Sequence, residues 1–201
     1  MNIVDATILG ILQGLTEFLP VSSSGHLVLG QDLLGINQPG NSFEIIVHIG
    51  TLFSVLTFFW TDIVSLLSFS NHKYSIKYIL YIIVGTLPAG VIGLVFKDSI
   101  SLFFDNRLVV GYALICTSFI LFLSFFKKTN NKNISFLFAF IIGCSQAIAI
   151  IPGISRSGVT ICIAILLGLS SKEAARFSFM LAIPIISGAG LLNVLDNNNI
   201  T

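Results

Sequence analysis

Residues 10–27 read GILQGLTEFLPVSSSGHL, and this stretch decides how the rest of the chain is interpreted. It places Gln13, Glu17 and His26 in an apolar segment, together with three consecutive serines and the helix breaker Pro20. An ionisable side chain inside a membrane costs at least about 2.5 kcal/mol, so residues of this kind usually have a function there. Gln13 and Glu17 are four residues apart, and on a helix the amide and the carboxylate therefore share one face.

The residues after Pro20 indicate an anion site. Pro20 is expected to end the first helix, and the serines that follow can cap a second one. Hydroxyls and free backbone N–H groups at a helix start favour the binding of phosphate. The predicted phosphate-binding residues of this stretch are Ser22, Ser24 and Gly25.

A second copy of the stretch occupies residues 143–160. A gapless alignment gives identities at Gly10 and Gly143, Gln13 and Gln146, Ser22 and Ser155, Ser24 and Ser157, and Gly25 and Gly158. The informative differences are Glu17 against Ile150, Ser23 against Arg156 and His26 against Val159. One copy thus supplies an acid and an imidazole, and the other a guanidinium. Its predicted phosphate-binding residues are Ser155, Ser157, Gly158 and Thr160.

The composition predicts an integral membrane protein. Of 201 residues, 55% are apolar and 9% are charged, and the mean hydropathy is +0.97, far from the values of soluble proteins. The net charge of +1 argues against nucleic acid as a partner, because a phosphate-backbone binder needs a basic face. The three cysteines lie singly in apolar runs, without metal-ligand spacing.

The pattern of apolar segments predicts an all-α membrane domain built as an inverted-topology repeat, with two re-entrant helical hairpins and at least four spans. The helices in the hairpins, 2–34 and 134–169, are too short to cross about 30 Å of hydrocarbon, and irregular backbone at that depth has to be buried in protein or line a wet cavity. Three spans separate the copies, so the second hairpin enters from the opposite face. Repeat one is 1–126 with spans 43–69, 78–96 and 108–126, and repeat two is 134–201 with a span at 174–194. Because repeat two has one span against three, the C-terminal part is predicted to be truncated.

Loop charges predict the orientation. Loops 70–77 and 127–133 carry five lysines and no acid, whereas 97–107 balances two bases with two acids. Under the positive-inside rule the lysine-rich side is cytoplasmic. The first hairpin is therefore predicted to enter from outside, with the site open to the outer face.

Three segments, Gln13–His26, Phe43–Gly50 and Pro152–Thr160, carry a resemblance to a known family. In order and spacing they resemble the signatures of the undecaprenyl-diphosphate phosphatases of the bacitracin-resistance type, over essentially the whole chain. The resemblance implies a multi-pass protein of the bacterial inner membrane, with its site on the periplasmic side. It implies hydrolysis of the terminal phosphate of a C55 polyprenyl diphosphate, which recycles the lipid carrier of peptidoglycan synthesis and confers bacitracin resistance.

The resemblance also implies roles for individual residues. It assigns the catalytic positions to Glu17, Ser23, His26 and Arg156, with Gln13 beside them. The residues themselves add Gln146, the counterpart of Gln13, and the pair Glu44 and His48 as predicted supporting residues, the pair lining the outer mouth, forming a second shell of metal ligands, or serving the structure alone. A divalent cation, Mg²⁺ or Ca²⁺, is implied at Glu17, with Gln13 as a second candidate ligand. The chain departs from many relatives at Gln13, where they have a second glutamate, and at His48, where they have glutamine.

The residues leave the chemistry partly open. Arg156 is the natural phosphate clamp, because its fork binds phosphate oxygens bidentately and stays charged; Glu17 holds a cation, acts as a base, or forms a structural ion pair with Arg156. His26 is either a nucleophile or a general acid–base that activates water or Ser23. Ser23 is either the nucleophile or a phosphate-binding hydroxyl.

Two other functions compete with hydrolysis. Inverted hairpins that meet at the midplane are common in secondary carriers, so a transporter or flippase of a polyprenyl phosphate lipid is the first alternative. The second is an inactive truncated homologue. In each case the expected partners are a polyprenyl lipid and the surrounding membrane lipids, with a homodimer as a further predicted state.

Overall fold

A computed structural model describes residues 1–36, 42–67, 76–127 and 131–198, and within these ranges every regular element is an α-helix. The helices are α1 (Ile3–Thr16), α2 (Ser23–Leu33), α3 (Ser42–Phe58), α4 (Trp60–Leu67), α5 (Ile76–Val95), α6 (Lys97–Phe104), α7 (Arg107–Phe125), α8 (Phe136–Ile148), α9 (Arg156–Leu167) and α10 (Ser171–Asn198). The prediction of an all-α membrane fold is confirmed.

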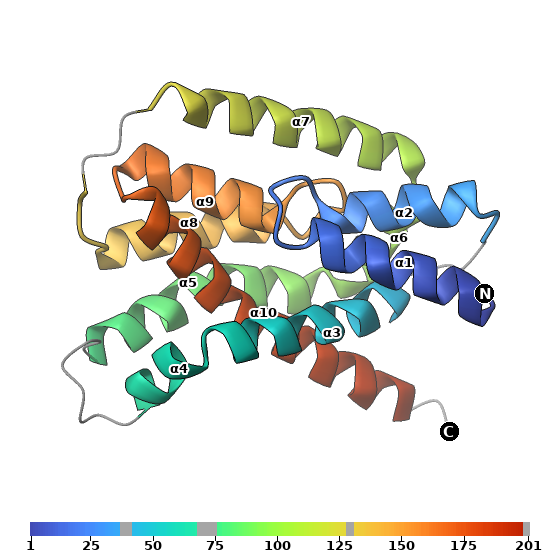
Figure 1. The fold of residues 1–201 in the computed structure, drawn as a ribbon, viewed down its shortest axis with the longest axis horizontal. Helices are drawn as coiled ribbons and strands as arrows, with labels where there is room; N and C mark the ends of the chain where they lie inside the picture. The colour runs from blue at the N-terminus through green and yellow to red at the C-terminus, as the bar shows by residue number, and fades with distance from the viewer. Residues whose placement is uncertain (37–41, 68–75, 128–130, 199–201) are drawn as a thin grey trace.

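Two short helix pairs, α1–α2 and α8–α9, form the predicted hairpins. The longest of the four helices, α1, has 14 residues and is about 21 Å long, too short to cross a bilayer. In Figure 1 the two hairpins enter from opposite ends of the molecule, and their connecting loops meet near its middle. Far-separated parts of the sequence thus lie side by side at the centre of the fold.

The first hairpin turns earlier than the sequence suggests. Pro20 was expected to end the helix, but α1 ends at Thr16 and residues 17–21 form a turn. The residue before a proline is disfavoured in the helical region, so the helix has to stop short of Pro20 itself. Glu17 thereby lies at the helix end, where its side chain can reach the neighbouring loop.

Among the described residues, three helices are long and apolar enough to span a membrane: α5, α7 and α10. A fourth span is obtained if α3 and α4 are counted as one, although they are bent by 73°. The predicted span over 43–69 thus contains a sharp bend, and its last two residues lie outside the described residues. Beyond the bend, Asp62 in α4 is buried and its carboxylate lies 3.5 Å from Nε of Arg176 in α10.

The helices pack closely where glycines face each other. At Gly143 in α8, an added Cβ would lie 2.4 Å from the carbonyl oxygen of Gly85 in α5. The two backbones are thus in direct contact, as in the small-residue interfaces of membrane helices. Beside this contact Ile142, Phe177 and Leu181 form part of a buried core that joins α5, α8 and α10.

The outer surface of the bundle is apolar. Leu87 in α5 and Phe119 in α7 are more than half exposed, as are many other large apolar side chains. Such a belt suits contact with lipid tails and not with water. The loops used to predict orientation, 70–77 and 127–133, lie in part outside the described residues.

Candidate active site

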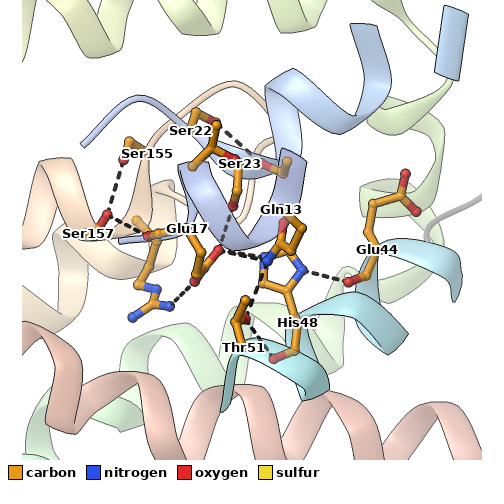
Figure 2. Close-up of polar contacts among 12 residues, drawn as sticks. Gln13, Glu17, Ser22, Ser23, Glu44, His48, Thr51, Ser155 and Ser157 are labelled. Carbon is orange, nitrogen blue, oxygen red and sulfur yellow. Dashed lines mark hydrogen bonds and ion pairs between the residues drawn. The ribbon is translucent and has the colours of Figure 1, made fainter. Parts of the chain in front are cut away.

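Glu17 is the centre of a buried polar cluster at the meeting point of the two hairpin loops (Figure 2). Its Oε1 accepts a hydrogen bond from Nη2 of Arg156 at 2.6 Å. Its Oε2 accepts from Oγ of Ser23 at 2.5 Å and from Nε2 of Gln13 at 3.0 Å. The acid of the first copy and the guanidinium of the second therefore meet, as the sequence predicts, although 139 residues separate them.

His48 supplies the imidazole of this cluster. Its Nε2 lies 3.3 Å from Oε2 of Glu17, and its Nδ1 lies 2.6 Å from the carbonyl oxygen of Glu44. Both ring nitrogens face acceptors, so both are placed to donate. Sequence analysis predicts only a supporting position for His48, whereas α3 brings it into direct contact with the carboxylate.

His26 lies elsewhere. It is one turn into α2, where its Nδ1 lies 2.8 Å from the carbonyl oxygen of Ser22. Ser22 has a φ of 67°, an unusual backbone conformation for a residue with a Cβ, and the ring of His26 stabilises this turn. Among the described residues no hydrogen bond joins this ring to Glu17, and the catalytic role of His26 stays a prediction.

Arg156 is the first residue of α9, and its neighbours fix the start of that helix. Ser155 caps the helix through a hydrogen bond from the N–H of Gly158 to its Oγ at 3.0 Å. The Arg156 guanidinium keeps one free side, since its buried Nη1 has no hydrogen-bond partner among the described residues. A buried N–H without a partner is costly, and a bound anion would remove that cost.

Contacts between the loops hold the two halves of the site in register. Oγ of Ser157 lies 3.5 Å from the carbonyl oxygen of Glu17 and 3.4 Å from that of Leu19. An added Cβ at Gly25 would lie 3.0 Å from Cα of Gly153. The loops therefore touch through their backbones, which leaves little freedom in the distance between Glu17 and Arg156.

A cavity of about 560 Å³ lies against this cluster and extends between α3, α5, α6 and α10. One end is polar and the remaining wall is mainly apolar, with Leu94, Ile150 and Leu192 among its members. The predicted site residues that line it are Glu17, Ser22, Ser23, Ser24, Glu44, His48, Gln146, Ser155, Arg156 and Ser157. A volume of this shape suits a ligand with a charged head and an apolar body.

Five predicted site residues, Gln13, Gly25, His26, Gly158 and Thr160, do not belong to the described cavity wall. Gln13 reaches the cavity only through Glu17. The N–H groups of Gly25 and Gly158 donate to the hydroxyls of Ser22 and Ser155, the residues that cap α2 and α9. Thr160 is fully buried and donates to the carbonyl oxygen of Arg156 at 2.7 Å, so it supports α9 from within.

Comparisons with known proteins give the family. A family model described as bacitracin resistance protein BacA matches residues 6–201. The undecaprenyl-diphosphatase of Halothermothrix orenii is 44% identical over 201 residues, which cover 98% of this chain and 76% of the relative. This chain belongs to the BacA family. The undecaprenyl-diphosphatase of Methanosphaera stadtmanae is 42% identical, covering 98% of this chain and 78% of that protein, and that of Christiangramia forsetii is 46% identical, with coverage of 94% and 74%.

The donor set of this BacA-family site does not match a ready-made metal site. Oε2 of Glu17 already accepts from Ser23 and Gln13 and faces Nε2 of His48, whereas Oε1 accepts only from Arg156 and keeps a lone pair. Over the part of the chain that the structure describes, no group of three or more His, Cys, Asp or Glu side chains is arranged to hold a metal ion. The divalent cation and its ligation by Glu17 or Gln13 stay a prediction from the resemblance.

Sequence reasoning missed Thr51. Its Oγ1 lies 3.4 Å from Nε2 of Gln13 and donates to the carbonyl oxygen of His48 at 2.9 Å (Figure 2). The signal was present in the spacing, because residues 44, 48 and 51 share one helix face. That face of α3 supplies the third wall of the cluster, beside the two loops.

Proposed function

We propose that this protein hydrolyses undecaprenyl diphosphate to undecaprenyl phosphate and orthophosphate. The observation that carries the proposal is the cluster of Glu17, Ser23 and Arg156 at the polar end of an otherwise apolar cavity. A lipid diphosphate has the matching form, with a charged head group and an apolar chain. The relatives named undecaprenyl-diphosphatase support this choice over a carrier.

In this proposal the guanidinium of Arg156 neutralises the negative charge of the substrate's phosphates. Phosphoryl transfer needs little covalent help from a protein, and catalysis depends mainly on positioning and on neutralising charge. One edge of the guanidinium is held by Glu17, and the other N–H groups remain for phosphate oxygens. Ser155 and Ser157 lie beside it in the cavity wall.

Ser23 is the nucleophile in this proposal. Its hydroxyl proton passes to Oε2 of Glu17, Oγ bonds to the terminal phosphorus, and the bridging P–O bond breaks with its electron pair on undecaprenyl phosphate. Water then attacks the phosphoserine, the Oγ–P bond breaks, and Glu17 returns the proton to Ser23 as orthophosphate leaves. The distance of 2.5 Å between Oγ and Oε2 supports this proton path.

The test is phosphate release by the purified full chain from undecaprenyl diphosphate in detergent. Removing the nucleophile in Ser23→Ala should lower kcat by about 1000-fold, and a substrate labelled in the terminal phosphate should leave no label on this variant after an acid quench. Ser118→Ala is the matched control, because Oγ of Ser118 is exposed and bonds to the carbonyl oxygen of Leu114 in its own helix, and this variant should keep kcat within about threefold. A Ser23→Ala variant with normal turnover would show that water attacks directly.

The two ring nitrogens of His26 can be tested separately. Asparagine can mimic an Nδ1 donor and glutamine an Nε2 group. Because Nδ1 of His26 meets the carbonyl oxygen of Ser22, we expect His26→Asn to retain activity within about tenfold and His26→Gln to lose more. The opposite order in steady-state assays, with Gln better than Asn, would return His26 to the chemistry as an Nε2 nucleophile or acid–base.

The cellular role follows from this activity and from the predicted orientation. The cavity wall includes Lys97 and Phe104 of α6, which joins α5 to α7 at the ends opposite those that carry Lys77 and Lys127. We therefore propose that the site opens to the periplasmic face of the bacterial inner membrane. There it would regenerate the lipid carrier for cell-wall synthesis and confer bacitracin resistance; the homodimer stays a prediction.

A further inference from the structure

Thr117 lies in α7, outside the motifs that mark the site. It is 3% exposed, and it is not part of the cavity wall formed by the described residues. In the sequence it is one of several hydroxyl residues in an apolar span, beside Ser118 and Ser124. Its contacts nevertheless lead to the loop between α8 and α9.

The hydroxyl of Thr117 bridges two backbone groups of that loop. Its Oγ1 donates to the carbonyl oxygen of Gly153 at 2.8 Å and accepts from the N–H of Ser155 at 3.0 Å. The partners are 36 and 38 residues away in the sequence. Both groups would otherwise lie buried without a regular helical partner, because they belong to the turn that precedes α9.

The loop between α8 and α9 is tightly packed against α7 at Gly153. Gly153 has a φ of 97°, and an added Cβ would lie 2.5 Å from the carbonyl oxygen of Val110 and 2.7 Å from Cβ of Ala113. The turn therefore packs directly against α7, one to two helical turns before Thr117. Steric contact at Gly153 fixes how closely the loop approaches α7. The hydrogen bonds of the Thr117 hydroxyl fix the position of the loop along the axis of α7.

Arg156 begins directly after the anchored segment. Ser155 is the N-cap of α9 and Arg156 is its first residue. The hydrogen bond from Ser155 to Thr117 therefore holds the backbone one residue before Arg156. A displacement of about 1 Å in a group that binds the transferred phosphate can cost about 100-fold in rate. The start of α9 is thus a place where a distant hydroxyl can affect catalysis.

We propose that Thr117 is a positioning residue of the phosphatase reaction, acting through Arg156 by holding the Gly153–Ser155 turn in register. The proposal rests on the proposed function for its readout of turnover. It assigns to α7 a part in the site, although α7 contributes no residue to the described cavity wall.

Three single variants separate the hydroxyl from the bulk of the side chain. Thr117→Val keeps the shape and removes both hydrogen bonds, whereas Thr117→Ser keeps the hydroxyl. Ser118→Ala is the matched control, because Oγ of Ser118 bonds only to the carbonyl oxygen of Leu114 within α7. We expect kcat to fall about tenfold in Thr117→Val and to stay within about threefold in the other two. Thr117→Ala replaces the valine variant if that protein does not purify.

A double-variant cycle tells positioning from general stability. If Thr117 acts through Arg156, the Thr117→Val effect on kcat should shrink to less than about threefold in an Arg156→Lys background, because coupled sites are not additive. A purely structural residue would give the same factor in both backgrounds. Equal factors, or a melting temperature that falls while kcat per folded protein is unchanged, would overturn the proposal.

A binding experiment keeps this proposal separate from the proposed function. Inorganic pyrophosphate should raise the melting temperature of the wild type and of Thr117→Ser, and the rise should be at least halved in Thr117→Val. If the three proteins show this pattern but the wild type releases no phosphate from the lipid, the phosphatase function is refuted. Thr117 then still positions Arg156 for the binding of a diphosphate. An equal rise in Thr117→Val and the wild type refutes the positioning role.

Discussion

Arg156→Lys should lower kcat/KM for undecaprenyl diphosphate by at least about 100-fold, a loss typical of removing one donor to the transition state. Lysine keeps the positive charge, but it lacks the planar fork with which Arg156 binds Glu17 on one edge and phosphate on the other. The charge then remains while the geometry is lost, and kcat should fall more than KM rises. Steady-state phosphate release from the purified variant measures both.

The control for this substitution is Arg107→Lys. Arg107 forms an exposed ion pair with Asp32 at 2.5 Å, and its side chain is 70% exposed. Exposed pairs contribute little, so this variant should keep kcat/KM within about twofold. If Arg156→Lys matches it, Arg156 is a structural ion-pair partner of Glu17 and the assignment of the phosphate clamp is wrong.

Gly143→Ala should destabilise the folded protein by about 3 kcal/mol, at the upper end of what overpacking costs. The new methyl group would meet the Gly85 backbone at 2.4 Å, and backbone cannot rotate away as a side chain can. The helices α5 and α8 must separate, which also disturbs the contact of Gln146 with the Gly85 carbonyl at 3.4 Å. A thiol-reactive dye would follow the loss as exposure of the buried Cys162 during heating in detergent, in a background with Cys116→Ser and Cys144→Ser because those two thiols are more accessible.

Gly10→Ala is a matched control provided by the repeat itself. Gly10 is the counterpart of Gly143 in the first copy, but an added Cβ there has no atom within 4 Å. Alanine is the better helix former by roughly 0.5–1 kcal/mol, so this variant should melt at the same temperature or slightly higher. Equal losses in both variants would show that backbone freedom, not the α5–α8 contact, decides the effect.

The hairpins and their meeting could be predicted because the sequence marks them twice. Serines and a proline or glycine interrupt an apolar run in each copy, and the copies diverge at Glu17 and Arg156, which suggests that each completes the other. These are local signals, and the structure follows them. The same logic located the cavity end formed by Ser22–Ser24 and Ser155–Ser157.

The parts that could not be predicted depend on contacts that no local pattern encodes. Residues 58–60 contain neither proline nor glycine, so nothing local marks the bend that precedes the pairing of Asp62 with Arg176. His26 and His48 are both plausible imidazoles in sequence, and only the packing of α3 against the loops places His48 beside Glu17. Thr117 shows no motif, because its partners lie on the loop between α8 and α9.

The pairing of Glu17 with a residue 139 positions later has a consequence for the assembly of the protein. The ribosome delivers the first hairpin long before its cationic partner exists, so a nascent chain holds an acid at membrane depth without its counter-charge. Until the second hairpin is inserted, that loop has to remain hydrated or be sheltered by the insertion machinery. Chains stalled before residue 156 should therefore be preferred substrates for membrane quality-control proteases.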